Sequence, residues 1–152
     1  MIQFFKKRNK FFTTEENQHI VEAIQQAEKK TSGEIRVFVE SKCSYMNALD
    51  RAREIFAKIQ MHKTADKNAV LIYVAVKDRQ LAIFGDEGIH VKVGDEYWNN
   101  QVKLMISHFN SENFAEGIRQ CVLEVGEALT KYFPYNKDTD KNELPDDIVF
   151  GR

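Results

Sequence analysis

The chain has 152 residues, of which 43% are hydrophobic and 30% are charged, and its formal net charge is -1. These values are typical of one soluble globular domain that is long enough to bury a core. The nearly neutral charge argues against nucleic acid as a partner, because phosphate binding needs a basic surface.

The N-terminal segment, residues 1–11, is basic and rich in phenylalanine. It lacks the apolar core of a secretory signal, and no stretch of the sequence reaches transmembrane length. Its phenylalanines are compatible with contact with an anionic membrane surface or with packing on the domain, and we favour packing. We therefore expect a cytoplasmic protein.

Local patterns predict the first helices and strands. Thr13 and Glu16 match a capping box, and apolar residues at helical spacing follow up to about residue 30. Residues 34–39 alternate and are rich in β-branched side chains, which predicts a strand. A second apolar stripe at helical spacing predicts a helix over residues 48–59.

The second half of the domain begins with residues 69–76, which are apolar on both faces, as expected of a central strand. Residues 81–84 follow a short turn and are predicted to pair with that strand as a hairpin. Two more helices are indicated by apolar stripes, one from Trp98 to Phe109 and one from Phe114 to Leu129.

The predicted fold class is α/β, a three-layer α/β/α sandwich around a small mixed β-sheet, with element order α-β-α-β-β-α-α. The first two strands are joined by a helix and should be parallel, whereas the third should be antiparallel to the second. We expect this domain to span residues 12–133, after the separate segment 1–11. Residues 134–152 are highly charged and are expected to form a solvated C-terminal tail.

This topology predicts that three loops meet at one edge of the sheet. The third strand runs backwards, so the "GDEG" loop at 85–88 should lie beside the starts of the other two strands, at 31–34 and 66–68. The edge would gather acidic side chains, an amide and glycines that let backbone approach a ligand. We therefore expect a ligand edge that includes Gly33, Glu34, Asn68, Gly85 and Gly88.

Excess carboxylates near glycine turns favour a hard cation, Ca²⁺ or Mg²⁺. The candidate metal ligands are Asp86, Glu87, Asp95 and Glu96. The stretch does not follow EF-hand spacing, and an alternative remains open. In that alternative the acids are solvated, and Asp95 and Glu96 only favour the N-terminus of the following helix through its dipole.

Other common chemistries lack their motifs in this sequence. It contains no P-loop, GxGxxG, GxSxG or HExxH pattern, which argues against a nucleotide cradle, a serine nucleophile elbow or a zinc protease site. The four histidines are scattered. Cys43 and Cys121 form no CxxC or Cys/His cluster, so we expect buried, reduced thiols.

Three stretches together resemble the TPM domain family: "SGEIRVFV", "NAVLIYVAVKDRQLAIFGDEGI" and the later Trp98. The similarity covers residues 12–133. The family includes a plant thylakoid-lumen phosphatase and many bacterial envelope proteins, which often carry a signal peptide and a membrane anchor that are not recognisable here. The resemblance implies an α/β/α sandwich, weak acid-phosphatase activity in some members and calcium binding in others. The matching motif positions are Gly33, Glu34, Asn68, Gly85, Asp86 and Gly88.

The sequence thus supports three hypotheses, which we rank in order. The first is a divalent-cation-binding domain, with Ca²⁺ preferred over Mg²⁺. The second is a non-catalytic module that binds an unidentified protein partner. The third is a weak metal-dependent acid phosphatase, for which no catalytic residue is assigned.

Overall fold

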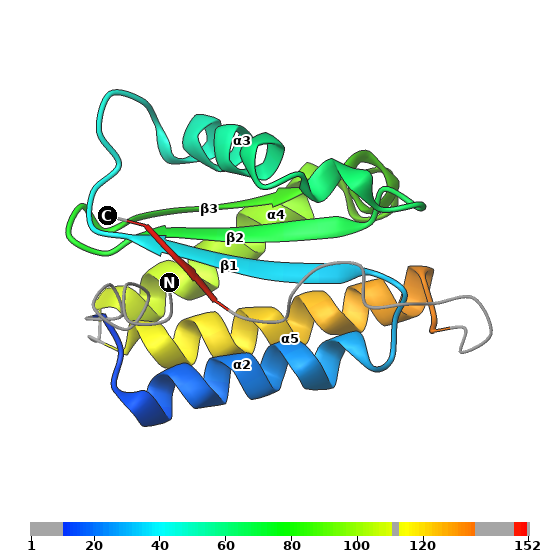
Figure 1. Ribbon diagram of the computed structural model, residues 1–152, viewed down its shortest axis with the longest axis horizontal. Coiled ribbons are helices and arrows are strands. Elements are labelled where there is room, and N and C mark those ends of the chain that lie inside the picture. The colour runs from blue at the N-terminus through cyan, green and yellow to red at the C-terminus, as the bar shows by residue number, and fades with distance from the viewer. Residues whose placement is uncertain (1–10, 111–112, 136–147, 152) are drawn as a thin grey trace.

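The computed structural model describes residues 11–110, 113–135 and 148–151, in which helices cover both faces of a β-sheet (Figure 1). The elements are α2 (Thr14–Glu28), β1 (Glu34–Glu40), α3 (Ala48–Lys58), the 3-10 helix η1 (Met61–Lys63), β2 (Ala69–Ala75), β3 (Gln80–Gly85), α4 (Glu87–Asn110), α5 (Phe114–Tyr132) and β4 (Val149–Phe150).

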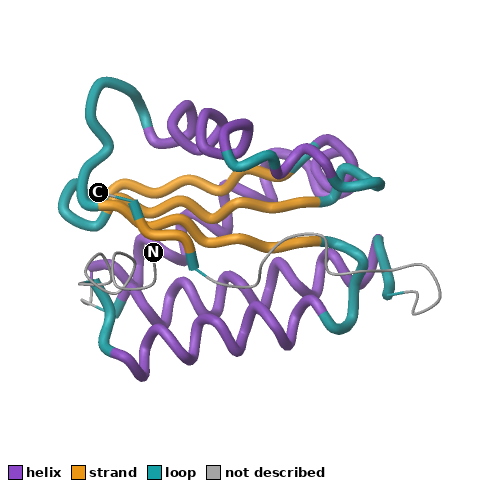
Figure 2. The backbone as a smooth tube through the Cα atoms, viewed as in Figure 1, coloured by secondary structure: helices purple, strands orange, loops and turns teal. Residues whose placement is uncertain are grey.

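The strand order in the described sheet is β3-β2-β1-β4 (Figure 2). Strands β1 and β2 are parallel, with Glu34 opposite Ala69, and β3 is antiparallel to β2, with Gly85 opposite Val70. This arrangement confirms the predicted mixed sheet and α/β/α fold class. The predicted capping box of the first helix is also present, since Thr13 and Glu16 bond to each other's backbone amides.

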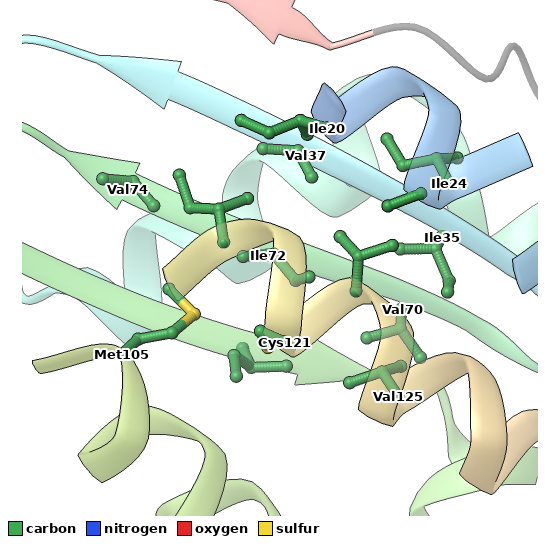
Figure 3. Close-up of a cluster of buried hydrophobic side chains, with 14 of the residues drawn as sticks. Ile20, Ile24, Ile35, Val37, Val70, Ile72, Val74, Met105, Cys121 and Val125 are labelled. Atoms are coloured by element: carbon green, nitrogen blue, oxygen red, sulfur yellow. The ribbon is translucent and has the colours of Figure 1, made fainter. Parts of the chain in front are cut away.

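The core lies on both faces of the sheet. Odd-numbered residues of β1 and even-numbered residues of β2 pack against α2, α4 and α5, as Figure 3 shows for Ile35 and Ile72. The opposite face packs against α3 through a smaller cluster that includes Phe56 and Tyr73. Because β2 is buried on both faces, its seven residues are all apolar or aromatic, as expected of a central strand.

One expectation for the C-terminal tail is wrong. Residues 149–150 form β4, which pairs in parallel with β1, so that Phe38 lies opposite Val149. The neighbouring Ile148 and Phe150 are buried, and the Phe150 ring lies 6.0 Å from that of Phe12. These apolar residues leave the solvent because they cover the free edge of β1 and part of the core. Residues 136–147 of the predicted tail lie outside the described part of the chain.

The acidic stretch that was expected to be a turn is helical. Helix α4 begins at Glu87 and bends at Gly94, whose φ of 80° and ψ of 169° are outside helical geometry. Asp86 occupies the N-cap position, since its carbonyl accepts the first helical hydrogen bond, from the His90 amide at 2.9 Å, and its Oδ1 accepts a bond from the Glu87 amide at 2.8 Å. A glycine at the bend avoids the strain that a side chain would suffer at this φ.

None of the helices within the described ranges is both long and apolar enough to cross a membrane. The prediction of a separate basic segment over residues 1–11 lies outside the described residues, except for the half-buried Phe11.

The thiol of Cys121 is expected to be unreactive in the folded protein. It is 2% exposed within the core on α5, and this burial raises its pKa above the usual value for a thiol. Because the thiolate is the reactive species, iodoacetamide should modify Cys121 only when the core opens. Mass spectrometry of protein labelled with and without urea would measure this. Rapid labelling of Cys121 in native protein would contradict the packing described here.

Candidate functional site

The three predicted loops do meet at one end of the sheet. The Glu34 amide donates a hydrogen bond to the Asn68 carbonyl at 3.4 Å, and the Asn68 side-chain amide donates one to Ser32 Oγ at 3.1 Å. The Asp86 amide donates to the Ala69 carbonyl at 2.9 Å. We call this end of the sheet, made of residues 31–34, 66–68 and 85–88, the loop edge.

Gly88 lets the start of α4 lie directly against the loop before β2. A Cβ atom at this position would lie 2.1 Å from the Asp66 carbonyl oxygen and 2.6 Å from that of Lys67. At Gly33 the approach is less close: an added Cβ would lie 2.8 Å from the Leu129 side chain and 3.1 Å from the Asn68 carbonyl oxygen. Two of the three glycines of the predicted ligand edge, Gly33 and Gly88, therefore allow backbone to approach backbone.

Gly85 has a different neighbour. A Cβ atom there would lie 2.4 Å from the Trp98 ring. The absence of a side chain at Gly85 therefore lets the indole of α4 pack on the end of β3. The Trp98 indole N–H also donates a hydrogen bond to His90 Nδ1 at 3.0 Å, which fixes the orientation of the imidazole.

Asp86 is the central carboxylate of the loop edge. Its Oδ1 caps α4, whereas its Oδ2 is buried and has no hydrogen-bond partner among the described residues. Glu34 lies in the same row across the sheet, since Ala69 is opposite Glu34 of β1 and its carbonyl bonds to the amide of Asp86, the residue after β3. Glu34 is 2% exposed, so the loop edge contains two carboxyl side chains that are at least partly withdrawn from solvent.

The other predicted ligands are more exposed. Glu87 points to solvent, and Asp95 and Glu96 are exposed on the second part of α4, beyond the bend at Gly94. The Asp95 carboxylate lies 3.5 Å from His90 Nε2, and its side chain is 89% exposed. Asp95 therefore faces the first part of α4 across the bend, and Asp95 and Glu96 also begin the second part of the helix.

Among the described residues, no three side chains of the His, Cys, Asp and Glu types come close enough to hold a metal ion together. A cation at the loop edge would thus need ligands of other kinds, such as backbone carbonyls and water. The carbonyls of Asp66 and Lys67 and the unpaired oxygen of Asp86 are the oxygens available for this.

A groove of about 470 Å³ runs from the loop edge along β3, between α3 and α4. We call it the β3 groove. Its lining combines apolar side chains with Arg53 and a group of acidic residues at one end. It is formed by Leu49 and Arg53 of α3, residues 81–86, and Glu87, His90, Asp95, Trp98, Asn99 and Val102 of α4. Sequence reasoning missed this groove because α3 and α4 become neighbours of β3 only in the folded chain.

A buried polar cluster at the opposite end of the strands was also missed. Arg51 Nε and Nη2 donate hydrogen bonds to the Glu40 carboxylate at 2.9 and 3.0 Å, and the Tyr73 hydroxyl donates a third. The hydrogen bond to Glu40 raises the pKa of Arg51, and burial raises that of Tyr73. A glutamate at the end of a strand and an arginine eleven residues later gave no local signal of this pairing.

The sequence matches the family model described as "TPM domain" over residues 6–128. No curated protein matches the chain.

Solved structures show the same fold. The NMR structure of the BA42 protein from the psychrophilic bacterium Bizionia argentinensis is 43% identical, with a TM-score of 0.85, and the alignment covers 94% of this chain and 97% of that chain. The N-terminal domain of a protein from P. gingivalis is 18% identical, with a TM-score of 0.66 and coverage of 84% and 83%. The N-terminal domain of the cg2496 protein from Corynebacterium glutamicum is 12% identical, with a TM-score of 0.57 and coverage of 91% and 80%.

Proposed function

The chain belongs to the TPM domain family, and from this membership and the geometry of the loop edge we propose that it binds a divalent cation there, preferring Ca²⁺ to Mg²⁺. The observation that carries the proposal is Asp86 Oδ2, a buried carboxylate oxygen without a hydrogen-bond partner among the described residues. Burying such an oxygen costs free energy unless a donor or a cation compensates it.

The neighbouring groups have the right chemistry for a hard cation. Backbone carbonyls of the loop before β2 approach the start of α4 closely at Gly88, and carbonyl oxygens are ordinary ligands of Ca²⁺. The Asn68 side-chain oxygen is also buried and without a hydrogen-bond partner among the described residues. The Asn68 side chain is instead engaged with Ser32, just before β1, whereas Asp86 follows β3, on the other side of β2. We therefore assign Asp86 as the carboxylate that binds the cation, and Asn68 as a structural neighbour that does not bind it.

The cation is bound weakly. Few carboxylates converge at the loop edge, and affinity for Ca²⁺ rises with the number of charged ligands. The dissociation constant is therefore of the order of 10⁻³ M, as for weak extracellular calcium modules. Ca²⁺ is preferred because it accepts irregular sets of carbonyl, carboxylate and water ligands, whereas Mg²⁺ requires a near-ideal octahedron.

A calcium titration followed by ¹H–¹⁵N NMR spectra tests this proposal. In the wild type, the amide signals of residues 85–97 should shift at millimolar calcium. The Asp86→Asn variant keeps the size and the capping oxygen of the side chain but loses its charge. It should therefore bind calcium about tenfold more weakly, or not at all. Asp50→Asn, on an exposed carboxylate of α3, is the matched control and should bind as the wild type does.

Two further variants decide the role of the second acidic pair. If Asp95 and Glu96 complete the cation shell, Asp95→Asn and Glu96→Gln will each weaken binding. If they only begin the second part of α4, calcium binding will be unchanged in both. Unchanged spectra of the wild type at millimolar calcium, or equal affinity in the Asp86→Asn and Asp50→Asn variants, would rule out the proposed site.

A phosphatase reaction has weaker support. Both cysteines are buried in the core, at 7% and 2% exposure, so neither is available as a nucleophile. Hydrolysis would have to use a water molecule, with Asp86 or His90 in the groove as the general base. No described contact favours this reaction over simple cation binding.

A further inference from the structure

β3 is the outer strand of the described sheet, and its backbone groups point alternately toward β2 and away from the sheet. The Asp86 amide bonds to the carbonyl of Ala69, which lies directly opposite in the register. In an antiparallel pair, residues two apart face the same neighbour, so Phe84 and Ala82 also bond to β2. Leu81, Ile83 and Gly85 must therefore direct their N–H and C=O groups away from the sheet.

These outward groups repeat about every 7 Å along the strand. Among the described residues, no segment outside the sheet forms a backbone hydrogen bond with Leu81, Ile83 or Gly85. Natural sheets usually protect such an edge with lysine, proline, a bulge or a covering segment. The six residues of β3, "QLAIFG", contain neither lysine nor proline.

The space beside this edge has the walls that an added strand needs. In an extended segment, alternate side chains would point toward opposite faces of the sheet. In the β3 groove one face is walled by Leu49 of α3, and the other by Trp98 and Val102 of α4. Figure 1 shows β3 with α3 on one face and α4 on the other. Both sets of side chains would thus meet apolar surface.

The charge of the groove is asymmetric. Asp86, Glu87 and Asp95 lie at the end near the loop edge, whereas Arg53 lies on the α3 wall. A ligand with a lysine or arginine at one end would place its positive charge among these carboxylates. His90 lies beside them, with its imidazole held by Trp98.

We propose that the β3 groove binds an extended peptide segment of a partner protein, which adds to the sheet as a fifth strand beside β3. The segment pairs its backbone with Leu81, Ile83 and Gly85, carries apolar side chains over five or six residues, and has a basic residue at the end near Asp86. Backbone pairing supplies affinity and the two apolar walls supply selectivity, as in other cases of strand addition to a sheet edge.

Selection from a phage-displayed library of random linear peptides, with the full chain as bait, tests this inference. The selection and all titrations are done in EDTA, so that the result does not depend on the proposed cation site. We expect enrichment of peptides with an apolar extended stretch and a basic residue at one end. On binding, the amides of Leu81, Ile83 and Gly85 should become protected from hydrogen exchange, whereas those of Ala82 and Phe84 are already protected in the free protein.

A pair of matched variants locates the binding surface. Leu49 is 42% exposed and lines the groove, whereas Leu104 is 46% exposed on α4 and does not. Both positions are on the surface, so replacement by lysine should leave the fold intact, as far-UV circular dichroism will show. Leu49→Lys should weaken binding of the selected peptide about tenfold or more, because it places a charge on an apolar wall of the groove. Leu104→Lys should not change the affinity for the peptide.

Several results would overturn the inference. One is the absence of any enriched peptide, and another is equal binding by the Leu49→Lys and Leu104→Lys variants. Protection that does not alternate along β3 would exclude strand addition. Protection of the same three amides by raising the protein concentration alone, without peptide, would assign this edge to a second copy of the chain and exclude a peptide partner.

Discussion

Replacing Arg51 by methionine is expected to lower the free energy of unfolding by about 3 kcal/mol. The Glu40 carboxylate, only 6% exposed, accepts two hydrogen bonds from Arg51 and one from Tyr73. Without the guanidinium, a buried charge would keep only the tyrosine hydroxyl as a partner. The cost of breaking a buried ion pair on one side is several kcal/mol, and we expect the lower end because the Arg51 side chain is 24% exposed.

Urea unfolding followed by far-UV circular dichroism would measure this loss. The urea concentration at the midpoint should fall, whereas the slope of the free energy of unfolding against urea concentration should not change. Arg53→Met is the matched control from the same helix. Arg53 is exposed and lies over the Phe84 ring at 5.8 Å, a contact expected to contribute less than about 1 kcal/mol. Equal midpoints for the two variants would mean that the Glu40–Arg51 pair contributes nothing beyond a surface interaction.

The double variant Glu40→Met/Arg51→Met gives a further check on the same cluster. Because it removes both charges together, it should be more stable than the sum of the two single changes predicts. The pair would then be coupled, and its main effect would be to avoid an unpaired charge at the end of β1.

Gly88→Ala is expected to lower the free energy of unfolding by about 3 kcal/mol and to abolish the calcium response of residues 85–97. Its Cβ atom would lie 2.1 Å from the backbone oxygen of Asp66, closer than real contacts allow. A backbone carbonyl cannot move aside as a flexible side chain can, so α4 and the loop before β2 must separate. The carbonyls that we assign to the cation site would then move away from Asp86.

The same urea and calcium titrations measure both effects. Lys92→Ala, at an exposed position of the same helix, is the control and should change the free energy of unfolding by no more than about 0.5 kcal/mol. A Gly88→Ala variant with wild-type stability would show that the loop before β2 can move away from the added Cβ atom without lowering the free energy of unfolding. A destabilised variant that still binds calcium as the wild type does would remove the Asp66 and Lys67 carbonyls from the proposed site.

The features that could be predicted from the sequence are those that depend on neighbouring residues. The capping box at Thr13 was predictable because both of its hydrogen bonds join residues three apart. The central strand β2 was predictable because burial on both faces requires an unbroken apolar run. The meeting of three loops also followed, since a parallel crossover and a hairpin leave only one end where they can converge.

The missed features depend on residues that are far apart in the sequence. Strand β4 has only two residues, and its pairing with β1 is decided by the apolar edge that Phe150 covers. The start of α4 at Glu87 lies in a stretch with two glycines and several acids, which reads locally as a turn. It is helical because Asp86 caps it and because Ile89 and Trp98 are buried in the core.

The amino-acid sequence by itself determined the fold class, the order of the main elements and the place where acidic and glycine-rich loops gather, because periodicity and turn chemistry act over a few residues. Only the tertiary structure decided that Asp86 rather than Asp95 has a carboxylate oxygen withdrawn from water, and that β3 is the outer strand beside an apolar groove. Burial and hydrogen-bond satisfaction are properties of the packed chain, since they depend on which distant segments exclude water from a given atom.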